Sequence, residues 1–205
     1  MTTLLLLIML GAPVVSPAPF ITIDDGPDYR RHVRTLQLLQ RHHVRATWFV
    51  NGHFLQSKRN QRLLRQIVRA GHRVANHLYS HRDPCRMSSR QFLYELRRTE
   101  RMVNFALGRR YQLRLYRPPF GHRCHAILAM QRGYHVQYWH RADIGSTAQQ
   151  MIRTVLHRWR HRPPRRSILL FHHHNRKLQA VLRRFYPRAK RSRPRPPTVV
   201  KHPQR

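Results

Sequence analysis

Short apolar runs and longer amphipathic segments alternate along this chain of 205 residues. Runs of four or five mostly apolar residues are typical of buried strands, whereas apolar residues that recur every three or four positions indicate one face of a helix. The predicted strands are 20–23, 46–50, 73–76, 113–116, 135–139 and 167–171, with 198–200 as a candidate seventh. The predicted helices are 30–43, 60–70, a helix between Ser88 and Gly108, 124–132, 147–160 and 177–186.

This alternation of strand and helix implies a parallel sheet with right-handed crossovers. The expected fold class is α/β, a small, distorted or incomplete (β/α) barrel of six to seven parallel strands. Ser88 and Gln91 form a capping-box pattern, and Gly133 marks a helix end. On the helix at 147–160, the residues expected to face inward are Met151, Ile152, Val155, Leu156 and Trp159.

The two ends of the chain differ in composition from the middle. Residues 1–18 contain an apolar run at 4–10, too short to span a bilayer, followed by small residues, which predicts a signal peptide. A buried strand or helix at the start of the fold is the alternative. Residues 19–186 form one predicted domain, and 187–205 a basic, Pro- and Arg-rich tail. We therefore expect a secreted or cell-envelope protein without a transmembrane segment in the mature chain.

Basic residues dominate the charge, because 41 Lys+Arg against 7 Asp+Glu give a formal net charge of +34. The Arg residues are spread over every predicted helix, so we interpret them chiefly as surface residues. Non-specific attraction to polyanions or an anionic cell wall is still expected, but the sequence shows no specific nucleic-acid motif. The two cysteines, Cys85 and Cys124, either form one disulfide or remain unrelated thiols.

Two of the seven acidic residues, Asp24 and Asp25, are adjacent. Neighbouring carboxylates repel, so a cation must stabilise the pair, and a bound metal ion is the strongest candidate. Polar clusters follow five predicted strands, whose carboxyl ends open on one face of a parallel barrel. They are Asp24-Asp25, 76–81, 116–121, Asp143 and 172–174. One Asp with His77 and His81 suits a divalent ion, although without the Asp doublet two solvated histidines would be the better interpretation.

Four motifs stand in a fixed order along the chain: Asp24-Asp25, His77 with His81, Arg117-Pro118-Pro119-Phe120 and Leu170-Phe171-His172. This order resembles that of polysaccharide deacetylases of the NodB type, carbohydrate esterase family four. The segments 46–52 and 71–77 are similar to that family's second strand and to the run into its metal-binding motif. The resemblance covers residues 20–182 and implies the NodB homology fold.

The resemblance also implies site roles. Asp24 would be the general base, which Arg117 would hold in its ionised form. His172 would be the general acid, and the backbone N–H of Phe120 would stabilise the oxyanion. The ligands of a divalent metal, zinc in first place and Co²⁺ or Mn²⁺ otherwise, would be Asp25, His77 and His81. The substrate-binding residues would be Pro119, Trp139 and Leu170, the last of these lining the acetyl pocket.

Two departures from the family pattern concern the acid. The fourth motif falls at residues 139–146, where there is one Asp, Asp143, and no following Trp. Asp143 fits as the electrostatic partner of His172 only if the strand register slips by one residue. His173 stands where an Asp is usual.

Three functions are compatible with these features. The first is a metal-dependent hydrolase that removes N-acetyl groups from a glycan such as peptidoglycan or chitin-like oligomers. The second is a catalytically weakened, glycan-binding relative, which the altered fourth motif favours. The third is a polyanion-binding protein on this scaffold, which only the charge favours. We rank them in that order.

Overall fold

The computed structural model describes residues 18–161 and 166–187. The predicted signal peptide up to residue 17, most of the predicted tail and the candidate strand at 198–200 lie outside the described residues. No helix in the described ranges combines the length and the apolar composition that a membrane span requires.

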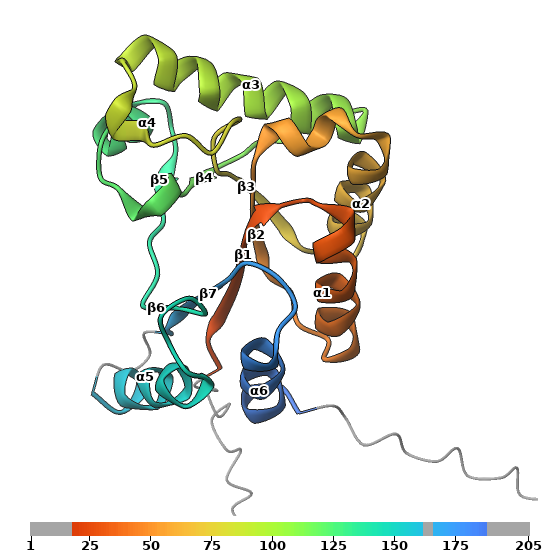
Figure 1. Ribbon diagram of the computed structural model, residues 1–205, viewed down its shortest axis with the longest axis vertical. Coiled ribbons are helices and arrows are strands. Elements are labelled where there is room, and N and C mark those ends of the chain that lie inside the picture. Colours follow the sequence, from red (N-terminus) through yellow and green to blue (C-terminus); the bar gives the residue numbers. More distant parts are fainter. Residues whose placement is uncertain (1–17, 162–165, 188–205) are drawn as a thin grey trace, which may run out of the picture.

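The fold is built on one sheet of seven strands, all paired in parallel (Figure 1). The strands are β1 (Phe20–Gly26), β2 (Thr47–Val50), β3 (Arg73–Asn76), β4 (Leu115–Tyr116), β5 (His135–Val136), β6 (Arg141–Ala142) and β7 (Ile168–Phe171). Their order in the sheet is β5-β4-β3-β2-β1-β7-β6, so the two edge strands are neighbours in the chain. The sheet curls into an open half-barrel, which confirms the predicted incomplete (β/α) barrel.

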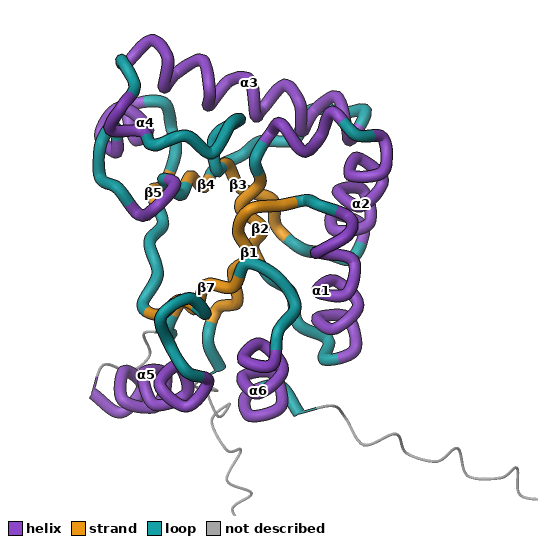
Figure 2. Tube along the Cα trace, viewed as in Figure 1, coloured by secondary structure: helices purple, strands orange, loops and turns teal. Residues whose placement is uncertain are grey.

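The helices lie around the outside of this curled sheet (Figure 2). They are α1 (Tyr29–Arg41), α2 (Lys58–Arg69), α3 (Ser89–Leu107), α4 (Ala126–Gln131), α5 (Ala148–His161) and α6 (Arg176–Phe185), with short 3₁₀ turns at Gly52–Gln56, Pro84–Arg86 and Pro119–Gly121. The predicted capping box is confirmed, since Ser88 and Gln91 exchange side-chain bonds with each other's backbone N–H groups. Gly108 ends α3 at a φ of 65°, which glycine tolerates because it has no Cβ.

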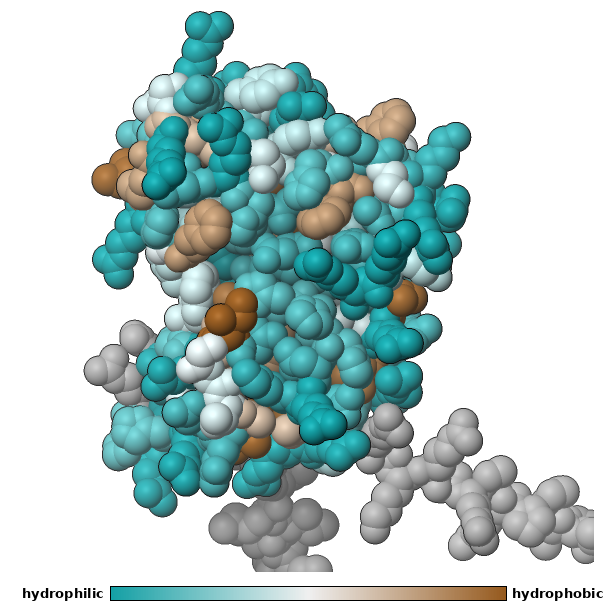
Figure 3. All heavy atoms as spheres, in the orientation of Figure 1, coloured by the Kyte–Doolittle hydropathy of each residue, from teal (hydrophilic) through white to brown (hydrophobic). Residues whose placement is uncertain are grey.

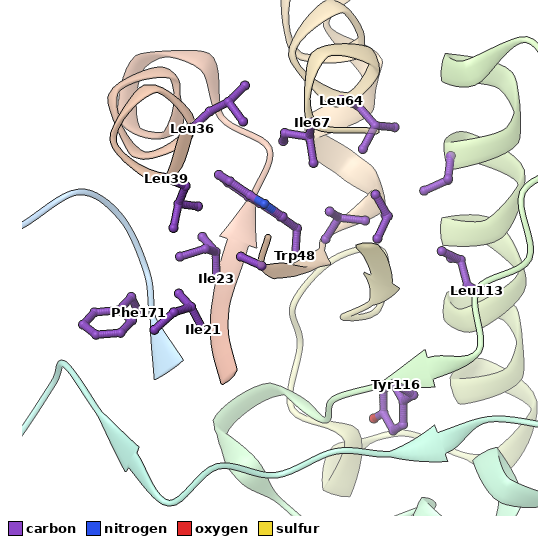
Figure 4. Close-up of a cluster of buried hydrophobic side chains, with 14 of the residues drawn as sticks. Ile21, Ile23, Leu36, Leu39, Trp48, Leu64, Ile67, Leu113, Tyr116 and Phe171 are labelled. Carbon is purple, nitrogen blue, oxygen red and sulfur yellow. The ribbon is translucent and has the colours of Figure 1, made fainter. Parts of the chain in front are cut away.

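Trp48 is the centre of the apolar core between the sheet and the first two helices (Figure 4). It is fully buried, as are Leu39 of α1 and Ile67 of α2. Complete burial of a Leu or Ile side chain contributes about 1.5–3 kcal/mol. The outer surface, in contrast to this apolar core, is mainly polar. The face in Figure 3 is mostly hydrophilic, with scattered apolar side chains.

The predicted strand at 135–139 is too long in this structure. Only His135 and Val136 pair with β4. The carbonyl oxygens of Gln137 and Tyr138 accept hydrogen bonds from the Arg117 guanidinium. These two carbonyl oxygens bind Arg117 instead of a neighbouring strand, so β5 ends at Val136.

The sequence did not predict strand β6. It consists of Arg141 and Ala142, which pair with Leu169 and Leu170 of β7. Two residues are too few to show a periodic pattern, and pairing with β7 alone defines the strand.

Other boundaries moved for local reasons. α4 begins at Ala126 instead of residue 124, because Cys124 is disulfide-bonded and His125 has a positive φ of 59°. β4 begins at Leu115, two residues later than predicted. On α5 the prediction was wrong for Leu156, which is 39% exposed, whereas Met151 and Val155 are buried as expected.

Candidate active site

A pocket of about 420 Å³ opens where the carboxyl ends of the strands meet. Most of the residues predicted to act together line it, although they come from distant segments of the chain. The lining residues are Asp24, Asp25, His77, His81, Pro118, Phe120, Trp139, Ala142, Ile144, Leu170 and His172.

Asp24 and Asp25 both line the pocket, although successive side chains of a regular strand point to opposite faces. Asp25 has a left-handed backbone with a φ of 61°, and the register of β1 against β2 shifts between Ile23 and Gly26. This irregular backbone turns the second carboxylate to the same side as the first. The surroundings still differ, because the Asp24 side chain is 2% exposed and that of Asp25 is 35% exposed.

The charge of Asp24 is balanced by Arg117, a fully buried residue. Arg117 Nη1 donates to Asp24 Oδ1 at 2.7 Å and to Thr22 Oγ1 at 2.9 Å. The guanidinium also lies over the ring of Phe49, 4.0 Å from its centroid. Burial lowers the pKa of Arg117, and the carboxylate of Asp24 opposes that shift. An ion pair removed from water this completely requires both partners.

Asp25, His77 and His81 form a group of potential metal ligands. Asp25 Oδ1 lies 3.3 Å from His77 Nε2 and 3.1 Å from His81 Nε2. His77 Nδ1 donates to the backbone oxygen of Arg117 at 2.7 Å, which leaves the lone pair of Nε2 directed at the group. Burial opposes ionisation of Asp25, but the two imidazoles outweigh it and hold the pKa of this carboxyl well below its usual range.

The donor set fits a divalent ion. Asp25 Oδ1 is buried and accepts no hydrogen bond of normal geometry from the described residues, although two imidazole nitrogens are directed at it. Two neutral imidazoles and one carboxylate are ligands that zinc binds, with further positions left for water or substrate. The second group with ligand atoms close together, Asp83, Cys85 and His122, is less suited because Cys85 is in a disulfide.

His172 also lines the pocket and directly follows β7. Its Nδ1 is 2.8 Å from Oδ1 of Asp143, and its Nε2 is 3.9 Å from Oδ2 of Asp25. Burial lowers the pKa of His172, but the hydrogen bond and the charge of Asp143, together with Asp25 and Asp24, raise it overall. Burial likewise opposes ionisation of Asp143, but His172 lowers the pKa of that carboxyl.

Asp143 reaches this position through the β6–β7 pairing. Ala142 pairs with Leu170, and the N–H of Asp143 donates to the oxygen of Leu170. The structure thus brings Asp143 against His172. Asp143 itself is 5% exposed and lies behind the pocket rather than in its lining.

The pocket walls are largely apolar. Trp139 and Leu170 line it as the sequence suggested, but Pro119 does not. The turn at Pro119–Gly121 directs Pro119 into the interior, where it is buried, and Pro118 faces the pocket in its place. Phe120, at a φ of 60°, is 60% exposed at the rim.

The sequence did not indicate several residues that complete the site. Ile144 forms part of the pocket wall. Asn175 Nδ2 donates to Asp143 Oδ2 at 2.6 Å, and Lys177 Nζ donates to the backbone oxygen of Asp143 at 2.5 Å. His32 Nε2 contacts the backbone oxygen of His172 at 2.6 Å. Asn175 also caps α6, so the preference for Asn at helix starts was a signal that could have identified it.

Comparison with known proteins identifies the class to which this fold and site belong. Residues 13–139 match the model of the polysaccharide deacetylase family, and the chain belongs to that family. The match covers β1 to β5 with the group of potential metal ligands and ends before Asp143 and His172.

Particular relatives are similar over parts of their length. A peptidoglycan-N-acetylglucosamine deacetylase of Bacillus cereus is 32% identical over 101 residues, 49% of this chain and 35% of the relative. A chitooligosaccharide deacetylase of Sinorhizobium fredii is 32% identical over 106 residues, 52% of this chain and 48% of the relative. A family 4 carbohydrate esterase from Streptomyces lividans, solved with acetate, superposes with a TM-score of 0.65 at 25% identity, covering 83% of this chain and 84% of its own. The matched segments are thus less than half of these two curated relatives.

Proposed function

We propose that this protein is a metal-dependent hydrolase that removes N-acetyl groups from a glycan, peptidoglycan or a chitin-like oligomer, outside the cell or in the cell envelope. One observation carries the proposal. The metal-ligand group lies in one pocket between a carboxylate paired with a buried Arg and a histidine paired with a buried Asp. Family membership and the names of the relatives support the substrate class.

Asp25, His77 and His81 would hold the metal, with zinc the ion that their donor atoms suit best. When bound, such an ion supplies Lewis acidity and lowers the pKa of a coordinated water. Asp25 lies near the carboxyl end of β1, and His77 and His81 follow β3, so the sheet positions the two segments relative to each other.

Asp24 is placed to take a proton from a water molecule in the pocket. Arg117 occupies Oδ1 of this carboxylate, and Oδ2 lies on the side of His77, 3.7 Å from its Nε2. Asp24 is almost completely buried. A general base must lie within hydrogen-bond reach of the proton that it abstracts, and Oδ2 is the oxygen of Asp24 that would provide that reach.

His172 is placed to return a proton to the departing amine. Its Nδ1–H donates to Asp143, so the ring presents Nε2 to the pocket. The raised pKa favours the protonated ring that a general acid needs. The backbone N–H of Phe120, on the pocket rim, is our candidate for stabilising the oxyanion.

The apolar walls suit the methyl of an acetyl group. Three apolar side chains, those of Leu170, Ala142 and Ile144, form part of the pocket lining. Burial of a methyl there is favourable by about 0.8 kcal/mol per carbon.

The decisive experiment measures acetate release from N-acetylated chito-oligomers and from peptidoglycan, with and without a chelator. We expect release that the chelator abolishes and added Zn²⁺ restores. Glycan binding without acetate release would instead support the weakened relative. Absence of both, together with absence of zinc uptake by the purified protein, would refute the proposal.

A further inference from the structure

The two loops that carry His81 and Phe120 are joined by a ladder of contacts. The first loop, residues 77–87, follows β3, and the second, residues 117–125, follows β4. The contacts follow the same order along both loops. They join His77 to Arg117, His81 to Phe120, Asp83 to His122, Cys85 to Cys124 and Met87 to His125.

The ladder runs from the pocket outward. At the inner end, the His81 and Phe120 rings lie 4.8 Å apart, centroid to centroid, in an edge-to-face arrangement. Further out, His122 Nδ1 lies 2.8 Å from Asp83 Oδ1, an exposed pair that water weakens. Cys85 and Cys124 form the one covalent contact, and they are the two cysteines of the chain.

Both loops also contain backbone conformations that L-residues seldom adopt. Leu78 and His81 in the first loop, and Phe120 and His125 in the second, have φ between 59° and 63°. Among the described residues, only two other non-glycine positions have positive φ. Such conformations persist only where the surrounding structure enforces them. The weak contacts near the surface are a poor source of that constraint, whereas a covalent bond is a strong one.

We propose that the Cys85–Cys124 disulfide is a positioning device that holds Phe120 and its N–H in place against the metal ligand His81. This inference rests on the proposed function for its catalytic consequence. Neither Cys85 nor Cys124 lines the pocket in which substrate and metal would bind. The disulfide acts through the two loops, and so couples the metal-ligand loop after β3 to the rim of the pocket after β4.

The test compares wild type with the double variant Cys85→Ser/Cys124→Ser. The control is Arg86→Ala, which alters an exposed side chain in the same turn and leaves the disulfide intact. Mass spectrometry first establishes that the wild-type protein contains the bond. At a temperature where melting curves show all three proteins folded, zinc affinity is measured by competition with a chromophoric chelator, and kcat and KM on a chito-oligomer.

We expect the double variant to bind zinc roughly tenfold more weakly and to lose roughly tenfold in kcat, as for the loss of groups that support metal ligands. KM should change less than about twofold, since the disulfide does not contact substrate. Reduction of wild type with a phosphine, followed by its removal, should reproduce the loss, and reoxidation should restore both values. Arg86→Ala should match wild type.

A structural readout keeps the inference testable even if the proposed function fails. A nuclear Overhauser effect between the rings of His81 and Phe120 should be present in oxidised wild type and absent in the double variant. Wild type that neither binds zinc nor releases acetate would refute the proposed function, yet this signal would still decide whether the disulfide positions the loops. Free thiols in oxidised wild type would overturn the inference. So would wild-type zinc affinity, kcat and ring contact in the folded double variant.

Discussion

The two ends of the candidate active site are built in different ways. We call Asp24, Asp25, His77, His81 and Arg117 the metal-binding end, after the three proposed metal ligands among them, and Asp143, His172, Asn175 and Lys177 the acid end, after the proposed general acid. Four residues of the metal-binding end lie at or just after the carboxyl ends of β1 and β3, which are well paired in the middle of the sheet, and Arg117 follows the short strand β4; all five stand in short motifs. The acid end depends on the two-residue edge strand β6 and on the start of α6.

The difference shows that Asp143 and His172 can meet in space although the fourth motif departs from the family pattern. The contact between Asp143 and His172 requires only that the N–H of Asp143 bond to Leu170 beside it. Asn175 and Lys177 then hold Asp143 from the other side. The missing second Asp and Trp of the fourth motif therefore do not by themselves imply a dismantled acid end.

The largest expected effect belongs to the metal-binding end. Asp24→Asn should retain zinc and lose roughly 10²–10⁴-fold in kcat, because an amide cannot accept the proton of water. Metal content and kcat of the purified variant are the measurements. Near wild-type turnover would show that Asp24 is only a structural partner of Arg117.

A second variant tests whether His172 contributes to catalysis as the general acid. His172→Gln should retain zinc and lose roughly 10²-fold in kcat, the lower part of the range for general acid–base catalysis. Since the ring of His172 is not among the proposed ligands, metal content serves as the internal control. An unchanged kcat would leave catalysis to the metal-binding end alone.

A pH profile tests the coupling of Asp143 to His172. Asp143 raises the pKa of His172, so the protonated acid survives to higher pH in wild type than without that carboxylate. In Asp143→Asn the alkaline limb of kcat/KM should move to lower pH, with a moderate loss at its maximum. A limb at the wild-type position would place Asp143 outside the catalytic pair.

The smallest effect is expected at Asn175, which has two roles that a matched pair of variants separates. Asn175→Ser keeps a side chain that can cap α6 but is too short to replace the amide beside Asp143. It should lower kcat severalfold with a nearly unchanged melting temperature. Asn175→Ala should lower kcat equally and also lose about 1 kcal/mol of stability through the missing cap. Wild-type kcat for the Ser variant would show that Asn175 only caps the helix.

Much of the central fold could be predicted from the sequence. Strands such as 73–76 and the helix after Ser88 carry apolar periodicity and end signals that act over a few residues. The metal-binding end was equally visible, since an Asp doublet and a His pair follow directly from strands that the apolar pattern identifies. The sequence also correctly predicted an incomplete barrel.

The features that the sequence analysis predicted wrongly, left open or missed depend on contacts between distant residues. Strand 135–139 ends early because the buried Arg117, twenty residues before Gln137, binds the carbonyl oxygens of Gln137 and Tyr138. The disulfide, left open by the sequence, needed the loops after β3 and β4 to meet. Pro118 lines the pocket in place of Pro119, because Pro119 is buried at the start of the turn Pro119–Gly121.

The sequence by itself thus determined the alternating elements, the curled parallel sheet and the residues of the metal-binding end. Only the tertiary structure decided the β6–β7 register, the partners of Asp143, the disulfide and the wall formed by Ile144. The physical reason is range. Apolar periodicity and capping act between residues a few positions apart, whereas Asp143 and His172 are separated by 29 residues and meet only after β6 has paired with β7.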